Sequence, residues 1–494
     1  MEVLSSVAAR PADALAALRW HRRGATVLAC GLLSAAACAA AAAPPPATLA
    51  LIRDTAMHSD WAYQRLADLT DKVGPRLAGS VQYSAAAAQV AATMRALGAR
   101  VTLQPAKVTH WVRGEERGEL TDYTGRPEGV TQRLQLTALG RSGATPAAGL
   151  EARVIVIRDF DDLQAHAAEV RGRIVLFDSR FDQRLADNGQ AGEAYSQAGK
   201  YRVNGPSAAA ALGAAAALVR SIGGGEYRLP HTGVTVWSER QAPIPAAALA
   251  AEDADLILRL AAQGPVTMRL VLTPQTLPDR EDLNVIADWP GSEHPDEYVV
   301  VSGHLDSWDL GTGATDDGSG VMAAAGVVQV LQKLQLHARR SIRFVGWADE
   351  EYGGRGGQAY YDALSGTIDS QCAAIESDLG AGRALGVEAA IAPGALASLK
   401  PVMDALAPIG VTVLKLGNGE VGTDIEPLQS AGVAAFSPLA DTRHYFDYHH
   451  TAADTLDKVD PESLQSQVAT MAVLAFFLAD RESCFPRVAV PERR

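Results

Sequence analysis

The chain has 494 residues, of which 48% are hydrophobic and 20% charged, and a formal net charge of −13. This composition is typical of a soluble globular protein, and the length exceeds the ~250–300 residues at which one hydrophobic core usually stops growing. We therefore expect at least two domains. The acidic balance and the absence of a basic stripe exclude nucleic acid as a partner, because phosphate binding relies on clustered Lys and Arg.

The N-terminus has the pattern of a secretory signal. Three arginines within residues 19–23 precede "GATVLACGLLSAAACAAAAA", and a triple proline follows. Charged, apolar and small residues in this order, with an A-x-A site near residues 41–43, predict a signal peptide over residues 1–43. We expect the mature protein to be exported, either periplasmic or extracellular. The alternatives are a core helix, or a lipid anchor at Cys38, although the residue three positions before Cys38 is alanine rather than a larger aliphatic residue.

The remaining cysteines, Cys372 and Cys484, are too few for a disulfide scaffold or a thiolate zinc site. One disulfide between them is possible in an oxidising compartment, but the sequence does not determine it. No later run of about 20 apolar residues stands out, so we expect no membrane span in the body of the protein.

The body of the chain divides into three stretches of different character. Helical periodicity runs from about residue 45 to residue 104. Short strand-like runs then alternate with turns from about residue 152 to residue 272, and "GPSAAAALGAAAALVRSIGGG" among them predicts an alanine-rich helix. The predicted domains are an N-terminal part of the catalytic domain at 44–145, an insert at 146–272, the rest of the catalytic domain at 273–485 and a tail at 486–494.

The third stretch carries the pattern of an α/β domain. Apolar runs in "LNVIADWPG", "EYVVVSGHLDS" and "RSIRFVGWADEE" predict strands, separated by helical patterns such as residues 321–334. This alternation predicts a sheet with helices on both faces. Ligands of such sheets bind outside the carboxyl ends of the strands, so charged residues at those ends are candidate site residues.

The second of these strands ends in a histidine and several aspartates. His304 and Asp306 lie two residues apart, on the same side of an extended chain. An imidazole beside a carboxylate suits a metal ligand and the group that orients it. Asp316 and Asp317 follow in "ATDDGSG", immediately before a predicted helix; taken alone, they also fit a turn with a helix N-cap.

Three further charged groups follow apolar runs or lie near the C-terminus, in "ADEEYGGRGG", "AAIESDLGAG" and "YFDYHHTAADT". Their members are Glu350 and Glu351, then Glu376 and Asp378, and finally His449, His450 and Asp454. Each group alone is weak evidence, since adjacent glutamates usually form a solvated face and a lone histidine is usually structural. Repeated at strand ends of one α/β unit, they indicate a shared site.

A set of two imidazoles and three carboxylates matches the needs of a site with two divalent metals. Such a site needs a bridging carboxylate and terminal ligands for each ion. Ligands of this kind, without thiolates, favour zinc, with cobalt or manganese as substitutes.

The motifs together resemble a known family, the co-catalytic zinc exopeptidases that include bacterial leucyl aminopeptidases, and within it the carboxypeptidase Q branch. The resemblance covers roughly residues 51–482. It rests on "SGHLDSWDLGTGATDDGSG", "EEYGGRGG", "ESDLGAG" and "GTDIEPLQSAGV", and in the insert on "YRVNGPSAAAALGAAAALVRSI" and "PHTGV". It implies a mixed, largely parallel sheet with helices on both faces, a β-rich lid of the protease-associated type, and a homodimer.

The resemblance also implies a role for each site residue. His304 and Asp378 would bind one zinc ion, and Glu351 and His450 the other, with Asp316 bridging both. Glu350 would be the general base for an attacking water, and Asp306 would orient His304. No role is assigned to Asp309 or Asp317.

Substrate contacts are less determined by the sequence. Tyr448 and His449 both precede the predicted ligand His450, so the group that stabilises the oxyanion stays open between them. Glu420 or Asp424, in "GNGEVGTDI", are candidates to meet a substrate ammonium, although this segment also fits a plain glycine-rich loop.

The resemblance implies hydrolysis of dipeptides or short peptides with free termini, as a dipeptidase or carboxypeptidase. The nearest alternative is a zinc aminopeptidase. A glutaminyl-cyclase-like transferase uses one zinc, a non-catalytic ectodomain would lack ligands, and a two-metal phosphoesterase would need more basic residues than Arg355. The insert shows no evident catalytic group, and a partner-binding role for it stays open.

Overall fold

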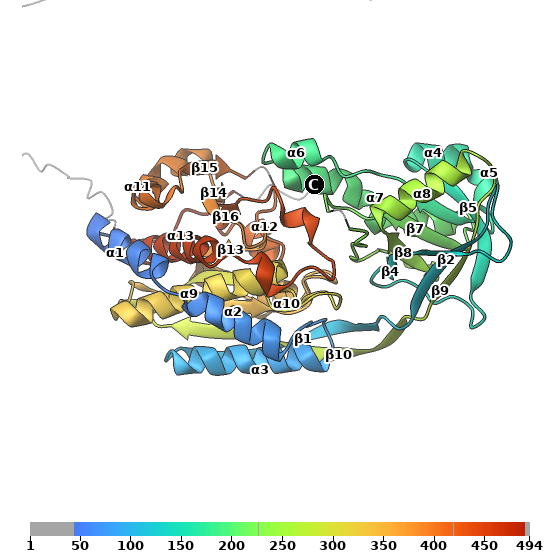
Figure 1. Ribbon diagram of the computed structural model, residues 1–494. Coiled ribbons are helices and arrows are strands. Elements are labelled where there is room, and N and C mark those ends of the chain that lie inside the picture. The colour runs from blue at the N-terminus through green and yellow to red at the C-terminus, as the bar shows by residue number, and fades with distance from the viewer. Residues whose placement is uncertain (1–43, 226, 418, 490–494) are drawn as a thin grey trace, which may run out of the picture. The chain divides into compact units, whose positions relative to one another are not determined.

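The computed structural model describes residues 44–225, 227–417 and 419–489 (Figure 1). The predicted signal peptide and its lipid-anchor alternative at Cys38 lie outside these residues. Within them, the chain forms two eight-stranded sheets. The class is α/β, as predicted.

The first sheet is mixed and carries the predicted catalytic strands. Its pairs β11–β12, β11–β13, β13–β16 and β14–β15 are parallel, whereas β1–β10, β10–β12 and β14–β16 are antiparallel. The strands in spatial order are β1 (Arg100–Val112), β10 (Gln275–Trp289), β12 (Arg340–Trp347), β11 (His294–His304), β13 (Gln371–Glu376), β16 (Ala435–Ala440), β14 (Ala384–Ala390) and β15 (Val413–Leu416).

Helices cover both faces of this sheet because its central strands are apolar on both sides. On β11, Val299 and Val301 face the larger core, and Val300 faces the smaller one. The larger core is packed by α1 (Pro46–Met57), α2 (Trp61–Lys72), α3 (Val81–Ala96), α9 (Ser319–Leu334), α11 (Lys400–Leu406) and α13 (Pro461–Ala479). The smaller core is packed by α10 (Arg355–Ala363) and α12 (Glu426–Ser430).

Helix α13 corrects one expectation from the sequence. It is 19 residues long and apolar enough to cross a membrane by length and composition, although no such run was expected after the leader. However, 83% of its most apolar window is buried inside the protein, where it packs against α1 and α9. Among the described residues it is the one helix that meets this criterion, and its burial is that of a core helix.

The second sheet is formed by the insert and the strands that flank it. Its strands in spatial order are β3 (Gln132–Leu134), β2 (Glu116–Asp122), β9 (Thr267–Leu272), β5 (Leu150–Ile157), β6 (Ile174–Phe177), β7 (Ala216–Arg220), β8 (Ala246–Leu249) and β4 (Leu136–Ala138). In chain order, the first strand of this sheet is β2, which begins at Glu116, upstream of the predicted insert boundary at residue 146. The predicted domain boundaries remain a prediction.

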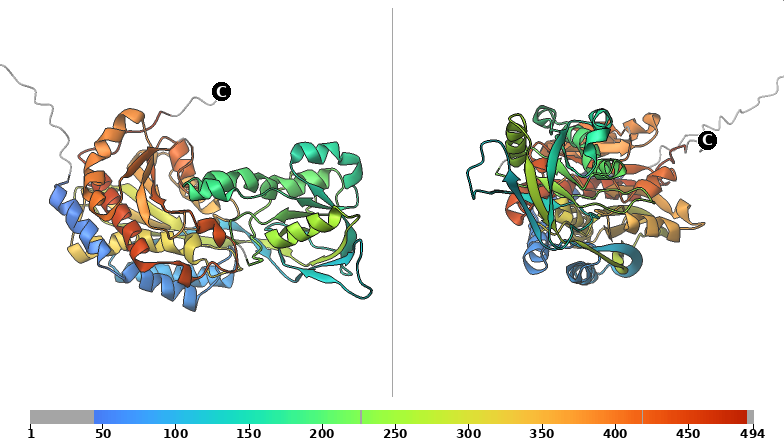
Figure 2. Two further views of the ribbon diagram at one scale, coloured as in Figure 1. Left: turned by 45° about the horizontal axis from the view of Figure 1, so that its top comes forward. Right: turned by 90° about the vertical axis from the view of Figure 1, so that its right-hand side faces the viewer.

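Helices also lie on both faces of the second sheet (Figure 2). They are α4 (Phe160–Ala165), α5 (Ala167–Val170) and α7 (Ala191–Ala211) on one face and α8 (Ala251–Ala261) on the other, whereas α6 (Gln183–Asp187) packs against α7. The alanine-rich segment predicted as one helix is helical only in its first third: α7 ends at Ala211, and β7 follows after Gly213, whose φ is +83°. The alanines of β7 are buried between β6 and β8, so sheet pairing overrides their helix propensity.

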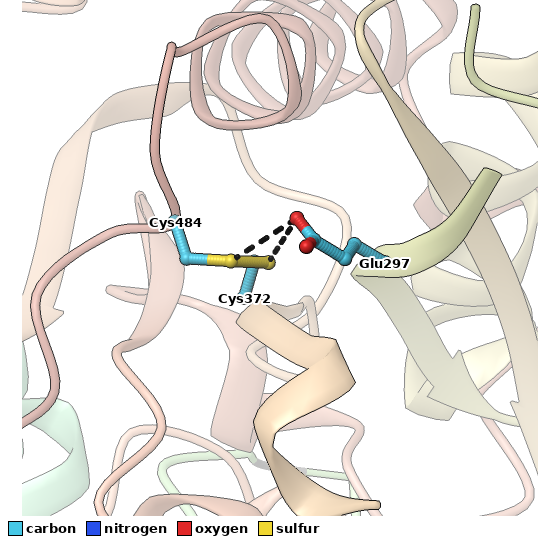
Figure 3. A group of neighbouring side chains, drawn as sticks. All are labelled: Glu297, Cys372 and Cys484. Atoms are coloured by element: carbon cyan, nitrogen blue, oxygen red, sulfur yellow. Dashed lines mark hydrogen bonds between the residues drawn. A yellow bond between two sulfur atoms is a disulfide. The ribbon is translucent and has the colours of Figure 1, made fainter. Parts of the chain in front are cut away.

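A disulfide joins Cys372, at the start of β13, to Cys484, which follows α13 (Figure 3). The two residues are separated by 112 positions. Both sulfur atoms lie close to the carboxylate of Glu297, at 3.9 and 3.7 Å. The bond therefore ties the C-terminal segment to the start of β13, a central strand of the first sheet.

Candidate metal centre and active site

The predicted metal ligands come together at the carboxyl ends of the parallel strands. His304 is the last residue of β11, Glu351 follows β12 and Asp378 follows β13. Asp316 lies in the turn before α9, and His450 lies in the loop after β16. Strand ends of one parallel set meet at one sheet edge, which explains how residues so far apart in the sequence converge.

Asp316 lies at the centre of the cluster. Its Oδ1 is 3.1 Å from Nε2 of His304, and its Oδ2 is 3.1 Å from Nε2 of His450. Nε2 of His304 is also 3.3 Å from Asp378, and Nε2 of His450 is 3.1 Å from Glu351. One carboxylate thus faces two histidines, each of which faces a further carboxylate.

Both of these histidines have their second ring nitrogen engaged by a backbone carbonyl. Nδ1 of His304 is 3.0 Å from the carbonyl oxygen of Asp306, and Nδ1 of His450 is 3.2 Å from that of Thr232. This contact fixes the ring and leaves Nε2 as the free ligand atom. The neighbouring His449 also brings Nε2 within 3.3 Å of Asp316, but its buried Nδ1 has no hydrogen-bond partner.

Other buried groups hold the ligands in place. Asp454 accepts hydrogen bonds from the amides of Thr315 and Asp316, at 2.7 and 3.1 Å. Asp317, which had no predicted role, accepts the amide of His304 at 3.1 Å. A side chain at Gly303 would collide with the Asp317 carboxylate, so this approach requires glycine.

The Asp306 carboxylate lies at the junction of two strand ends. It accepts the amides of Glu350 and Glu351, at 3.1 and 3.3 Å. Its Oδ1 is 3.7 Å from Nδ1 of His304, farther than its own backbone carbonyl. Asp306 therefore contacts the histidine mainly through its backbone, and its side chain fixes the turn that carries the two glutamates.

The cluster shifts the acidity of its members. Burial alone would raise the pKa of Asp316, but nearby His449 and hydrogen bonds from His304 and His450 hold that pKa well below its usual range. Burial raises the pKa of Glu351 to about 7. Burial also raises the pKa of Glu350 well above its usual range, with Asp378 adding to the effect against the opposing His304.

The donor set fits divalent metal ions. Oδ2 of Asp316 and Oε1 of Glu351 are buried and make no hydrogen bond, although imidazole nitrogens lie near both carboxylates. Buried carboxylate oxygens without hydrogen bonds are costly unless another group satisfies them. Imidazole and carboxylate ligands that converge in this way are those of a zinc site.

Comparison with known proteins agrees with these motifs. The profile of peptidase family M28 matches residues 284–475. Human carboxypeptidase Q is 35% identical over 428 residues, which cover 86% of this chain and 87% of the human protein. The chain belongs to peptidase family M28. Its similarity to carboxypeptidase Q confirms the branch predicted from the motifs.

Solved M28 structures share the fold. A peptidase M28 precursor from Shewanella amazonensis superposes with a TM-score of 0.84 at 35% identity, covering 90% of this chain and 99% of that one. A zinc aminopeptidase from Bacillus subtilis superposes with a TM-score of 0.59 at 23% identity, covering 84% and 94%. The predicted fold class is confirmed by these M28 structures.

A cavity of about 330 Å³ opens beside the cluster. Four of the predicted ligands, Asp316, Glu351, Asp378 and His450, line it, together with Glu350 and His449. The other lining residues were not singled out by the sequence and come from the insert and from loops of the M28 domain. These include Tyr195, Arg202, Thr423, Tyr445 and Phe446. The insert motif "YRVNGPS" contains Arg202 and carried the family resemblance, but its sequence alone gave no sign that α7 reaches the metal cluster.

Three predicted substrate residues lie outside this cavity lining. Tyr448 lines a separate hollow together with Lys458. Glu420 is exposed, and Asp424 is buried, although its neighbour in the chain, Thr423, belongs to the lining. The backbone amide of Asp424 donates to Glu376 at 3.2 Å, so this segment is anchored to the end of β13.

Proposed function

We propose that this M28 peptidase hydrolyses dipeptides or short peptides with free termini, using two zinc ions held by the Asp316 cluster. The observation that carries the proposal is the placement of Asp316 between His304 and His450, each 3.1 Å away. A carboxylate that has one histidine beside each of its two oxygens is arranged as a ligand that bridges two metal ions. Cobalt or manganese are the expected substitutes for zinc.

In this proposal each ion has a terminal histidine and a terminal carboxylate. His304 and Asp378 would hold one ion, and His450 and Glu351 the other. When bound, zinc ions lower the pKa of a water towards ~7 and polarise a carbonyl group.

In this proposal Glu350 is the general base that transfers the proton. It lines the cavity next to the cluster, where it is placed to accept a proton, and burial raises its pKa above the ordinary value of a glutamate. It takes a proton from the attacking water and delivers it to the amine of the leaving residue. Since water attacks the carbonyl directly, no covalent intermediate with the protein forms.

The protein is proposed to act after export, in the periplasm or outside the cell, as a homodimer. The disulfide between Cys372 and Cys484 supports this setting, because such bonds persist in oxidising compartments.

The test is a panel of free, N-blocked and C-blocked dipeptides, incubated with purified zinc-loaded protein. Cleavage of the free peptides alone supports a dipeptidase, and cleavage of the free and N-blocked peptides supports a carboxypeptidase. Cleavage of the C-blocked and free peptides but not the N-blocked ones would favour the aminopeptidase alternative. If none is cleaved with zinc bound, the proposal is wrong.

A further inference from the structure

Helix α7 of the insert brings two side chains to the cavity beside the metal cluster. Tyr195 and Arg202 are seven residues apart, two helical turns, and therefore lie on the same face. Both line the cavity that Asp316 and Glu350 also line. The Tyr195 ring packs edge-on against His449, with ring centroids 5.0 Å apart, so the pair lies close to the predicted ligands.

The guanidinium of Arg202 is buried without a counter-ion. It donates one hydrogen bond to the Tyr195 hydroxyl and a long one, 3.5 Å, to the Thr232 carbonyl. Its Nε is buried and has no partner. Across the described part of the chain, no carboxylate lies within ion-pair distance of it. Arg220 in the same insert is equally buried, yet it pairs with Asp178 and Asp255.

An unpaired buried cation is costly, so its presence in a cavity calls for an anionic ligand. The carboxylates of the described cavity lining are Asp316, Glu350, Glu351 and Asp378. All four have roles in the proposed metal site or in proton transfer. With two divalent ions bound, their negative charge is largely offset, and Arg202 gains no counter-ion from the protein.

The carboxylates of the lining also argue against recognition of a substrate ammonium group. No lining carboxylate of the described residues is left over to pair with one, and Glu420 and Asp424 lie outside the lining. The cavity volume of about 330 Å³ is at the small end for ligand sites, which suits a short peptide.

We propose that Arg202, held in place by Tyr195, binds the free α-carboxylate of the peptide substrate. The enzyme thereby recognises the C-terminal end of the peptide. The proposal rests on the peptidase function proposed above and adds the residue that selects the substrate. A guanidinium presents parallel N–H groups that match a carboxylate, which gives both energy and orientation. A C-terminal amide lacks the charge and one of the acceptors.

The test measures binding separately from turnover. The zinc-loaded Glu350→Gln variant, which is expected to bind without cleaving, is titrated by calorimetry with alanyl-alanine and with alanyl-alanine amide. The free dipeptide should bind roughly 30-fold or more tightly than the amide. Adding Arg202→Gln should abolish this preference, and Arg202→Lys should restore part of it. Lys200→Gln, which removes an exposed cation from the same helix, is the matched control and should change nothing.

Equal binding of the two peptides before Arg202 is changed would overturn the proposal, even if the wild-type enzyme cleaves both. A preference that survives Arg202→Gln in protein of unchanged zinc content would also overturn it. A carboxylate preference that depends on Arg202, in a wild-type protein that cleaves neither peptide, would support the proposal and contradict the peptidase function. If Arg202→Gln does not fold, Tyr195→Phe replaces it, and a weakened preference is expected.

Discussion

His450 and Thr232 are joined by two reciprocal hydrogen bonds. The amide of Thr232 donates to the carbonyl of His450 at 2.9 Å, and Nδ1 of His450 is 3.2 Å from the carbonyl of Thr232. His450 also has a φ of 61°, which is uncommon for a residue other than glycine. A loop of the insert thus holds a predicted metal ligand in a strained conformation, which links the insert to the metal site.

This relationship predicts different effects for the two adjacent histidines. His450→Ala should leave about one zinc ion per chain instead of two, because it removes a terminal ligand. His449→Ala should keep both ions, since Nδ1 of His449 has no fixed partner to orient the ring. Zinc content is measured by plasma emission spectrometry after gel filtration. Loss of zinc in His449→Ala alone would mean that the ligand is the other histidine.

Substitution of each of the two adjacent glutamates should also have a different effect. Glu350→Gln is expected to retain zinc and to lose a factor of about 10²–10⁴ in kcat on alanyl-alanine, the usual contribution of a general base. Glu351→Gln should lose zinc, since its carboxylate faces His450 at 3.1 Å. Metal analysis and turnover of both variants decide the matter, and zinc loss in Glu350→Gln would reverse the assignment.

A buried carboxyl away from the ligands should make stability depend on pH. Asp282 accepts the amide of Gly79, and burial raises its pKa to about 6, against an ordinary value of 3.8. Its contribution to stability is full below about pH 4 and is lost as the pH rises through 6, because the folded state then holds an ionised buried group.

The replacement Asp282→Asn removes this dependence. Relative to wild type, the variant should gain about 2–3 kcal/mol in free energy of unfolding between pH 4 and pH 7. The measurement is urea denaturation of both proteins in EDTA at the two pH values, so that metal binding plays no part. A difference between the proteins that is the same at both pH values would contradict the assignment.

The disulfide between Cys372 and Cys484 should stabilise the fold. It closes a long loop, with 112 positions between its ends, and removal of such a bond typically costs about 2–5 kcal/mol. Dithiothreitol should therefore lower the urea midpoint of the wild type. It should have no effect on the double variant Cys372→Ala, Cys484→Ala, and an equal effect on both proteins would show that the bond does not form.

Much of the metal cluster could be predicted from the sequence because each ligand ends or follows a strand with a clear apolar pattern. His304, for example, follows a run whose residues are buried on both faces of the sheet. The choice between His449 and His450 could not be derived from the pattern, since it depends on the carbonyl of Thr232, more than 200 residues away.

Other parts depended on tertiary contacts that a sequence pattern does not contain. The alanine-rich segment was predicted to be helical throughout, but neighbouring strands draw part of its second half into the sheet as β7. Arg202 was not predicted as a site residue, because an arginine on a helix is usually solvated. Only the packing of α7 beside His449 reveals that it lines the cavity.

The most direct test of the two-metal proposal is a zinc titration of protein stripped with EDTA, with hydrolysis of alanyl-alanine followed by amino-acid analysis. Activity should be absent at the start and should reach its plateau at about two zinc ions per chain. A plateau at one zinc ion, or full activity in the stripped protein, would contradict it.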